Sequence, residues 1–368
     1  MFSIIDRYVL KALLANYLIG LGVMMSLYVT LDMFVNMDEF TEQGYPIATV
    51  VANIASYYWP NLFNYFAQLS GAITLFACMA VIARMRRLNE LTAILSSGVS
   101  LYHLARPIIG FGVATTALLV IDTEWVIPSV AHLLARDHDD ADGKRAYEVL
   151  FLHDRDNALL CAGAFDPTTR DLHRLLVLKR GEHGAVTETW EADRAVWEPP
   201  GELRESGRWR LERGKRIVRV HHDGATLGPR DSVHETYPQF YESDLSPEAI
   251  QLRQAEGWIR YLSLSELRRQ EEGGTASRTT VMQARHTRIT APIISMVLLF
   301  LGLPFFLDRS PVDVLGDTGK CLIACGLCYV TNFVAQNLRT ETESALAAWI
   351  PIFVFATLAA VLIDRIRT

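Results

Sequence analysis

Few side chains in this 368-residue sequence have the types and spacing that metal binding or redox chemistry requires. Cys325 and Cys328 form a C-x-x-C pair, but a zinc or redox site would need a second ligand pair and access to water. His221 and His222 are adjacent on an expected strand, so their side chains point to opposite faces and cannot share one ion. We therefore expect no metal centre and interpret the two cysteines as small packing residues on a helix.

Nucleotide chemistry and acyl transfer also lack residues that they need. Gly319-Lys320 resembles the end of a phosphate-binding loop, but Val314 and Cys321 stand where that motif requires Gly and Ser or Thr. No G-x-S-x-G elbow accompanies the Ser, His and Asp residues of the chain's middle. We expect no catalytic residue and no cofactor in this chain, so any ATP chemistry must come from a partner.

The elements that would position functional residues fall into two kinds by polarity. The sequence has 35 Lys+Arg and 41 Asp+Glu, and most of them lie between positions 131 and 285. A net charge of −6 without basic blocks argues against nucleic-acid binding. Five cysteines in this length also exclude a disulfide-held scaffold. The pattern predicts apolar flanks around a polar domain.

Six stretches are long and apolar enough to cross a bilayer, which takes about 20 residues in a helix. The fold class that they predict is a polytopic α-helical membrane protein with six transmembrane helices, three in residues 1–130 and three in residues 286–368. The inserted polar domain covers residues 131–285. The expected spans are 12–35, 57–83, 104–127, 289–307, 321–338 and 345–363.

Basic residues near the span ends predict the orientation, because short basic loops stay in the cytoplasm. With both termini inside, only Arg288 and Arg339 of the flanking basic residues face outward, and the large polar domain is also outside. The residues expected inside are Arg7, Lys11, Arg84, Arg86, Arg87, Arg106, Arg309, Lys320, Arg365 and Arg367.

Short apolar runs broken by turn formers fill the polar domain from 147 to 222. They predict an antiparallel β sandwich or open barrel. Ser263 and Glu266 have the spacing of a capping box, which predicts a short helix near 264–272. The expected strands are Tyr147–His153, Ala158–Phe165, Leu172–Lys179, Ala185–Trp190, Trp209–Arg213 and Ile217–His221.

The loop after the second span has a helical apolar pattern. Leu88, Leu91, Ile94 and Leu95 recur at helical spacing and predict a short helix at about 86–98 with an apolar stripe. Glu90 lies beside this stripe, and Gly98 can end the helix. Two interpretations are open: an interfacial helix on lipid headgroups, or a coupling helix that docks into a groove on a cytoplasmic ATPase.

Short motifs along the whole chain carry a family resemblance. Besides the loop motif from Asn89 to Tyr102, they are Asp6-Arg7-Tyr8, Leu262–Leu267, Arg288 with Pro292, Leu301–Pro304 and Trp349–Pro351. In their order, with three spans on either side of a β domain, the sequence resembles the LptF/LptG permease family, the membrane subunits of the lipopolysaccharide-export ABC transporter. The resemblance implies a permease of the bacterial inner membrane with a periplasmic jelly-roll-like domain. It would extract lipopolysaccharide, or a related glycolipid, and pass it to a periplasmic bridge for export to the outer membrane.

The resemblance also implies partners and contact residues. Glu90, with Leu91, Leu95, Gly98 and Arg87, would contact a cytoplasmic ATPase dimer (LptB-like), which binds the ATP and Mg that this chain does not hold. The other implied partners are a sister permease or a second copy of this chain, a single-span bridge protein (LptC-like) and the periplasmic bridge (LptA-like). The first and fifth spans would form lateral gates for the lipid.

The outer end of the first span is acidic, with Asp32, Asp38, Glu39 and Glu42. A phosphorylated glycolipid instead calls for Lys or Arg. The candidates for lipid contact are therefore Arg288, Arg339, Met33 and Phe34. The alternative for both arginines is snorkelling at a helix end.

Two other functions stay open at this point. One is a mechanotransmission permease for lipoprotein release or envelope signalling, a type that usually has four spans. The other is a membrane-anchored envelope sensor or enzyme that works without an ATPase and binds a ligand in its β domain.

Overall fold

The chain forms two units, one helical and one built around a β-sheet. The computed structural model describes residues 4–37, 46–135, 145–156, 158–181, 185–201, 207–220, 232–254, 257–273, 278–307, 314–337 and 347–365. Three stretches build the helical unit: Met1–Met37, Asn61–Ser129 and Ile259–Thr368. The second unit consists of Asp38–Pro60 and Val130–Trp258.

Five described helical segments are long and apolar enough to cross a membrane, and a sixth apolar helix is shorter. The first three are α1 (Ile4–Val35), α3 (Ile47–Arg87), and α5 (Leu101–Ile121), which continues through the π-helix η1 (Asp122–Val126) into α6 (Ile127–Leu134). The others are α9 (Arg278–Leu307), α10 (Val314–Asn337) and the shorter α12 (Ile350–Arg365). The 16 residues of α12 span about 24 Å, less than the roughly 30 Å of hydrocarbon in a bilayer.

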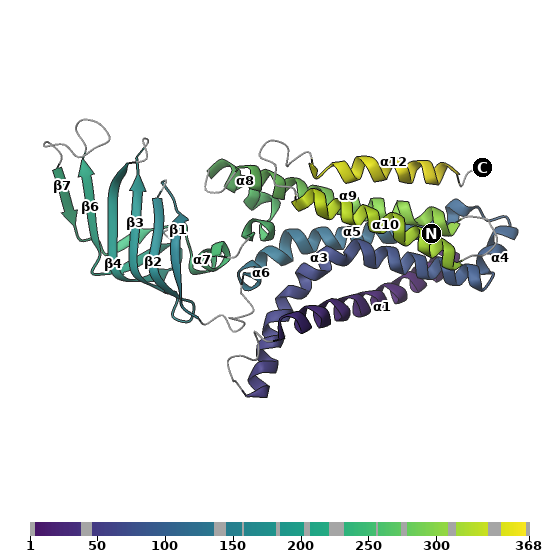
Figure 1. The fold of residues 1–368 in the computed structure, drawn as a ribbon, viewed down its shortest axis with the longest axis horizontal. Coiled ribbons are helices and arrows are strands. Elements are labelled where there is room, and N and C mark those ends of the chain that lie inside the picture. Colours follow the sequence, from purple (N-terminus) through teal and green to yellow (C-terminus); the bar gives the residue numbers. More distant parts are fainter. Residues whose placement is uncertain are drawn as a thin grey trace. The chain divides into compact units, whose positions relative to one another are not determined.

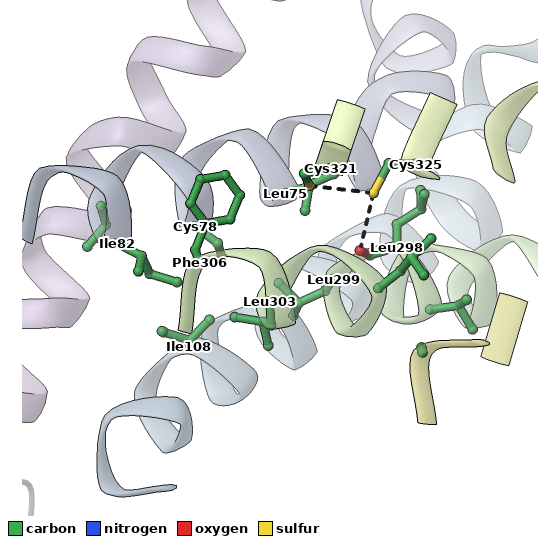
Figure 2. Packing of buried hydrophobic residues seen from close by; sticks show 14 of the residues in the cluster. Leu75, Cys78, Ile82, Ile108, Leu298, Leu299, Leu303, Phe306, Cys321 and Cys325 are labelled. Atoms are coloured by element: carbon green, nitrogen blue, oxygen red, sulfur yellow. Dashed lines mark hydrogen bonds between the residues drawn. The ribbon is translucent and has the colours of Figure 1, made fainter. Parts of the chain in front are cut away.

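Helix α9 lies at the centre of the helical unit, because it packs against α5, α10 and α12 (Figure 1). Glycines allow the closest of these approaches: a Cβ at Gly112 of α5 would collide with Leu299 of α9. Buried Cys321 and Cys325 of α10 face the same core with their Sγ atoms 3.9 Å apart, and both are free thiols (Figure 2). Small side chains therefore let these apolar helices pack closely.

The second unit contains an antiparallel sheet of eight strands (Figure 1). Strands β1 to β4 follow each other in the sheet, and the long strand β4 then pairs with β5 at one end and with β6 at the other. Strand β5 continues to β8, and β6 continues to β7. The strands are β1 (Tyr147–His153), β2 (Ala158–Asp166), β3 (Asp171–Arg180), β4 (Val186–Glu198), β5 (Arg208–Glu212), β6 (Lys215–Val220), β7 (Ser232–Thr236) and β8 (Phe240–Glu242).

Aromatic packing and one buried carboxylate stabilise the sheet. Trp209 of β5 is fully buried, and its indole nitrogen donates to the carbonyl oxygen of Leu245 at 3.2 Å. Asp154, just after β1, accepts hydrogen bonds from the Tyr241 hydroxyl at 2.9 Å and the Ser243 hydroxyl at 2.6 Å. Burial raises the pKa of Tyr241, so this hydroxyl stays a donor. Asp154 thus joins the end of β1 to the segment that follows β8.

The predicted fold class, a helical membrane protein with an inserted β domain, is confirmed. The structure adds β7, β8, α7 (Pro247–Gln254) and the 3₁₀ helix η3 (Trp258–Tyr261), none of which the sequence pattern indicated. The predicted short helix is α8 (Leu264–Gly273), and its capping box forms, with the Ser263 amide donating to Glu266 at 2.8 Å.

Helix α9 begins at Arg278, so the boundary predicted at 285 lies inside this helix. Hydropathy marks where a helix becomes apolar, not where its backbone hydrogen bonds begin.

Candidate functional site

A short helix, α4 (Glu90–Ser96), lies between two left-handed residues. Asn89 has φ 57°, and its amide donates to the carbonyl oxygen of Arg86 at 3.0 Å, which ends α3. Gly98 has φ 85°, and its amide donates to Leu95 at 3.1 Å, which ends α4. Glycine adopts this conformation without the strain that a Cβ would introduce. The helix is therefore shorter than the predicted 86–98, and Arg87 is the last residue of α3.

The apolar stripe of α4 faces the protein's own core. Leu91 is 5% exposed and belongs to the main buried cluster, and Ile94 and Leu95 pack against that cluster. Leu88 is 57% exposed and precedes the helix. Leu91 therefore anchors α4 to the bundle, and it has almost no surface left for a partner.

The outward face of α4 is small and polar. Its exposed residues are Thr92, Ala93 and Ser96, and the exposed Gly98 follows the helix. Arg87, at the end of α3, is exposed as well. A partner protein can approach this face closely because no large side chain projects from it.

Glu90 is held by a residue from the start of the chain. The Tyr8 hydroxyl of α1 donates to Glu90 Oε2 at 2.9 Å and accepts from Arg84 Nη2 at the same distance. One hydroxyl thus links α1, the end of α3 and the first residue of α4. This arrangement orients the Glu90 carboxylate and places a positive charge beside it.

A buried ion pair lies next to this network. Arg86 Nη1 of α3 contacts Asp317 Oδ2 of α10 at 3.0 Å, with side chains 4% and 18% exposed. Lys320 lies 3.4 Å from the other oxygen of Asp317. The end of α3 is therefore joined to the beginning of α10 by a charge pair shielded from water.

Arg288, predicted to contact lipid, is bound to protein backbone. Its guanidinium donates to the carbonyl oxygens of Thr123 in η1 at 2.7 Å, Arg260 at 2.8 Å and Leu262 at 2.9 Å. Nearby, Glu124 accepts from the amide of Leu264 at 3.0 Å. These contacts tie the end of the third span to the segment before α8, and they use three of the five donors of the guanidinium.

The other lipid-contact candidates lie apart from Arg288 in the contacts of the structure. Met33 and Phe34 are near the end of α1, where Phe34 is 68% exposed. None of the three hydrogen bonds of Arg288 involves α1. Arg339 is outside the described residues. The lipid-contact assignment of these four residues stays a prediction.

Within the second unit, a cleft of about 590 Å³ is lined by Trp197, Pro199 and Pro200 together with Arg170 and Glu248. Arg170 and Glu248 form an ion pair of 3.4 Å at its edge. The lining is thus partly aromatic and partly charged.

Sequence analysis missed Tyr8 and Asp317 as parts of this site. Tyr8 was counted only with the family motif Asp6-Arg7-Tyr8, and Asp317 lies 231 positions from its partner. The stretch before the fifth span holds Asp308, Asp313 and Asp317, and nothing in the local sequence distinguishes the one that pairs with Arg86.

Comparison with protein families decides the class of the chain. The family model described as lipopolysaccharide export system permease LptF/LptG matches residues 7–365. The chain belongs to the LptF/LptG family. A search of curated proteins returned no match.

Membership of the LptF/LptG family makes this chain a multi-pass membrane permease of lipopolysaccharide export. LptF/LptG permeases work in a complex with other Lpt proteins, and a partner supplies the ATPase. The match covers α1 to α12 and the inserted sheet, so the family assignment applies to both units of the chain.

Proposed function

We propose that this chain is the permease subunit that extracts lipopolysaccharide, or a related glycolipid, from the bacterial inner membrane and passes it to a periplasmic bridge. The family match over residues 7–365 carries this proposal. The match favours lipopolysaccharide export over the lipoprotein-release or signalling type, and over an envelope sensor that works without an ATPase.

The chain performs no bond chemistry in this proposal; it converts the movement of an ATPase dimer into movement of its helices. Helix α4 is the receiving element, because Leu91 fixes it to the core while its outward face is free of large side chains. Glu90 is the charged contact at the start of that helix, supported by Arg87 at the end of α3. The ATPase, not this chain, binds ATP and Mg.

Lipid extraction needs this external work. Moving an acyl chain from a bilayer into water costs about 0.8 kcal/mol per CH₂ group. A protein path from the spans into the β domain reduces that cost by keeping the chains out of water. In this proposal both termini are cytoplasmic, the β domain is periplasmic, and α1 and α10 form the lateral gates.

The complex that we propose holds this chain, a sister permease or a second copy, the ATPase dimer and a single-span bridge protein. Passage of lipid from the β domain to a periplasmic bridge completes the path. The acidic Asp32 at the outer end of α1 suggests that the sister permease supplies part of the positive charge for the headgroup.

Affinity purification in mild detergent tests the coupling step. The unmodified chain should recover its ATPase, whereas Glu90→Lys should recover much less. Glu148→Lys makes the same charge change at an exposed position of β1 and should recover the unmodified level. Equal recovery with Glu90→Lys, or no ATPase with the unmodified chain, would exclude the coupling role of α4.

Photo-crosslinking tests the lipid path. Crosslinkers at positions in α1, α10 and the β domain should each capture lipopolysaccharide. Labelling only at the outward-facing residues of α1 and α10, such as Leu18 and Ile323, would show ordinary contact with the bilayer instead.

A further inference from the structure

Helix α4 is joined to α3 and α5 by a short turn on each side. It is seven residues long, and a left-handed residue lies at each end, Asn89 and Gly98. Helices α1 and α10 are not neighbours of α4 in the sequence, so a displacement of α4 can reach them only through non-covalent contacts. The coupling of α4 to these two spans therefore depends on side-chain contacts.

Those contacts join α4 and the adjoining end of α3 to the two spans α1 and α10. Tyr8 of α1 bonds to Glu90 and Arg84, and Asp317 of α10 pairs with Arg86. Leu91 of α4 also belongs to the buried cluster that contains Val9 of α1 and Cys321 of α10. The same short stretch of chain, residues 84–91, thus contacts the beginnings of both spans.

We propose that Tyr8 and Asp317 are positioning residues that make α1 and α10 follow α4 when α4 is displaced. This inference rests on the proposed function, in which α4 receives the movement of the ATPase. In this inference Tyr8 acts through Glu90 and Arg84, and Asp317 acts through Arg86.

The two links differ in strength. The Arg86–Asp317 pair is nearly buried, and breaking a buried pair leaves an uncompensated charge. Tyr8 is 41% exposed, so water can replace much of what its hydroxyl contributes. Asp317 therefore governs how firmly α10 follows α4, and Tyr8 makes a smaller contribution that also orients Glu90.

The test uses the full complex of the chain with its ATPase and sister permease in proteoliposomes. The quantity measured is lipopolysaccharide released per ATP hydrolysed, which a change in protein amount does not alter. Tyr8→Phe should lower this ratio roughly threefold, and Asp317→Asn should lower it about tenfold or more. Asp317→Glu, which keeps the negative charge, should keep most of the lipid released per ATP by the unmodified chain.

Matched controls make the same chemical changes elsewhere. Tyr237→Phe alters an exposed tyrosine of the second unit, and Asp364→Asn alters an exposed carboxylate at the end of α12. Both should leave the ratio at the unmodified value. ATPase recovery with each variant shows that the complex has assembled.

The outcomes separate this inference from the proposed function. Suppose that Tyr8→Phe and Asp317→Asn both release as much lipid per ATP as the unmodified chain, while Glu90→Lys still loses the ATPase. This result would overturn the inference and leave the proposed function unaffected. Loss of the ATPase with Tyr8→Phe and Asp317→Asn would also overturn it, because these residues would then serve assembly and not transmission. Failure of the function itself would appear as lipid release by the unmodified chain that is independent of ATP.

Discussion

Arg288 provides a prediction whose magnitude follows from three hydrogen bonds. A net contribution of about 1.5–3 kcal/mol is typical for a buried bond to a charged group. The bond to Arg260 is exposed to solvent, and those to Thr123 and Leu262 are partly buried, so water replaces part of this energy when the side chain is removed. We expect Arg288→Ala to lower the free energy of unfolding by roughly 3–5 kcal/mol.

Lysine cannot reproduce this arrangement. Its ammonium is a point charge, whereas the planar guanidinium reaches carbonyls of two separate segments at once. Arg288→Lys should therefore lower the free energy of unfolding by about 2 kcal/mol. Arg278→Ala is the matched control, because Arg278 is exposed at the start of the same helix.

Thermal unfolding in detergent measures the effect, with Arg288→Ala expected to melt about 5–15 °C below the unmodified chain. Hydrogen exchange should rise locally in the segment around Leu262 and Leu264, which loses its tie to η1. Unchanged melting and unchanged exchange in Arg288→Ala would refute the structural role. Loss of lipid crosslinking in Arg288→Lys without any change in melting would instead support a headgroup contact.

Three further predictions concern packing and electrostatics. Gly112→Val should lower the free energy of unfolding by about 1–3 kcal/mol, because the new side chain collides with Leu299 in the core. Gly110→Val is the control, because Gly110 faces open space. Equal melting temperatures for the two variants would contradict this prediction. Asp154→Asn should lower the free energy of unfolding by about 2–3 kcal/mol, because an amide nitrogen cannot accept the hydrogen bonds that the carboxylate receives. Unfolding monitored by tryptophan fluorescence measures this loss of stability. Burial opposes ionisation of Glu188, but its hydrogen bonds to Arg216 and Trp190 and the positive charges of Arg216 and Lys179 together outweigh burial and lower the pKa of Glu188 from 4.5. The Glu188–Arg216 pair therefore stabilises the fold above pH 4.5, and this stabilisation is lost as the pH falls through the lowered pKa of Glu188. The difference in melting temperature between Glu188→Gln and the unmodified chain should therefore shrink from pH 7 to pH 3. A difference that grows on acidification would contradict that assignment.

Local patterns predicted much of the fold. The apolar runs located the six apolar helices found in the described part of the chain, and Ser263 with Glu266 located α8, because spans and capping boxes depend on residues close in sequence. The positions of the first strands, β1 to β4, were also predicted, because short apolar runs between turn formers mark a strand locally. The sequence left their order in the sheet open, and the structure shows that each of them pairs with the next.

Long-range pairing was not predictable in the same way. Strand β8 returns to β5, and β6 pairs with the far end of β4, so the branch of the sheet depends on contacts that no local pattern records. Helix α4 was expected from the spacing of Leu91, Ile94 and Leu95, yet that spacing does not say whether the stripe faces inward or toward a partner. The contact of Tyr8 with Glu90 joins residues 82 positions apart, and only folding brings them together.

Transport by a reconstituted complex tests the central claim most directly. This claim is that α4 transmits the movement of the ATPase to the permease. Proteoliposomes would contain the chain, its sister permease, the ATPase and labelled lipopolysaccharide, with a soluble acceptor outside. We predict that the acceptor gains lipid only with ATP, and that Glu90→Lys abolishes the gain while Glu148→Lys preserves it. Transfer that continues without ATP, or at the unmodified rate with Glu90→Lys, would contradict the claim.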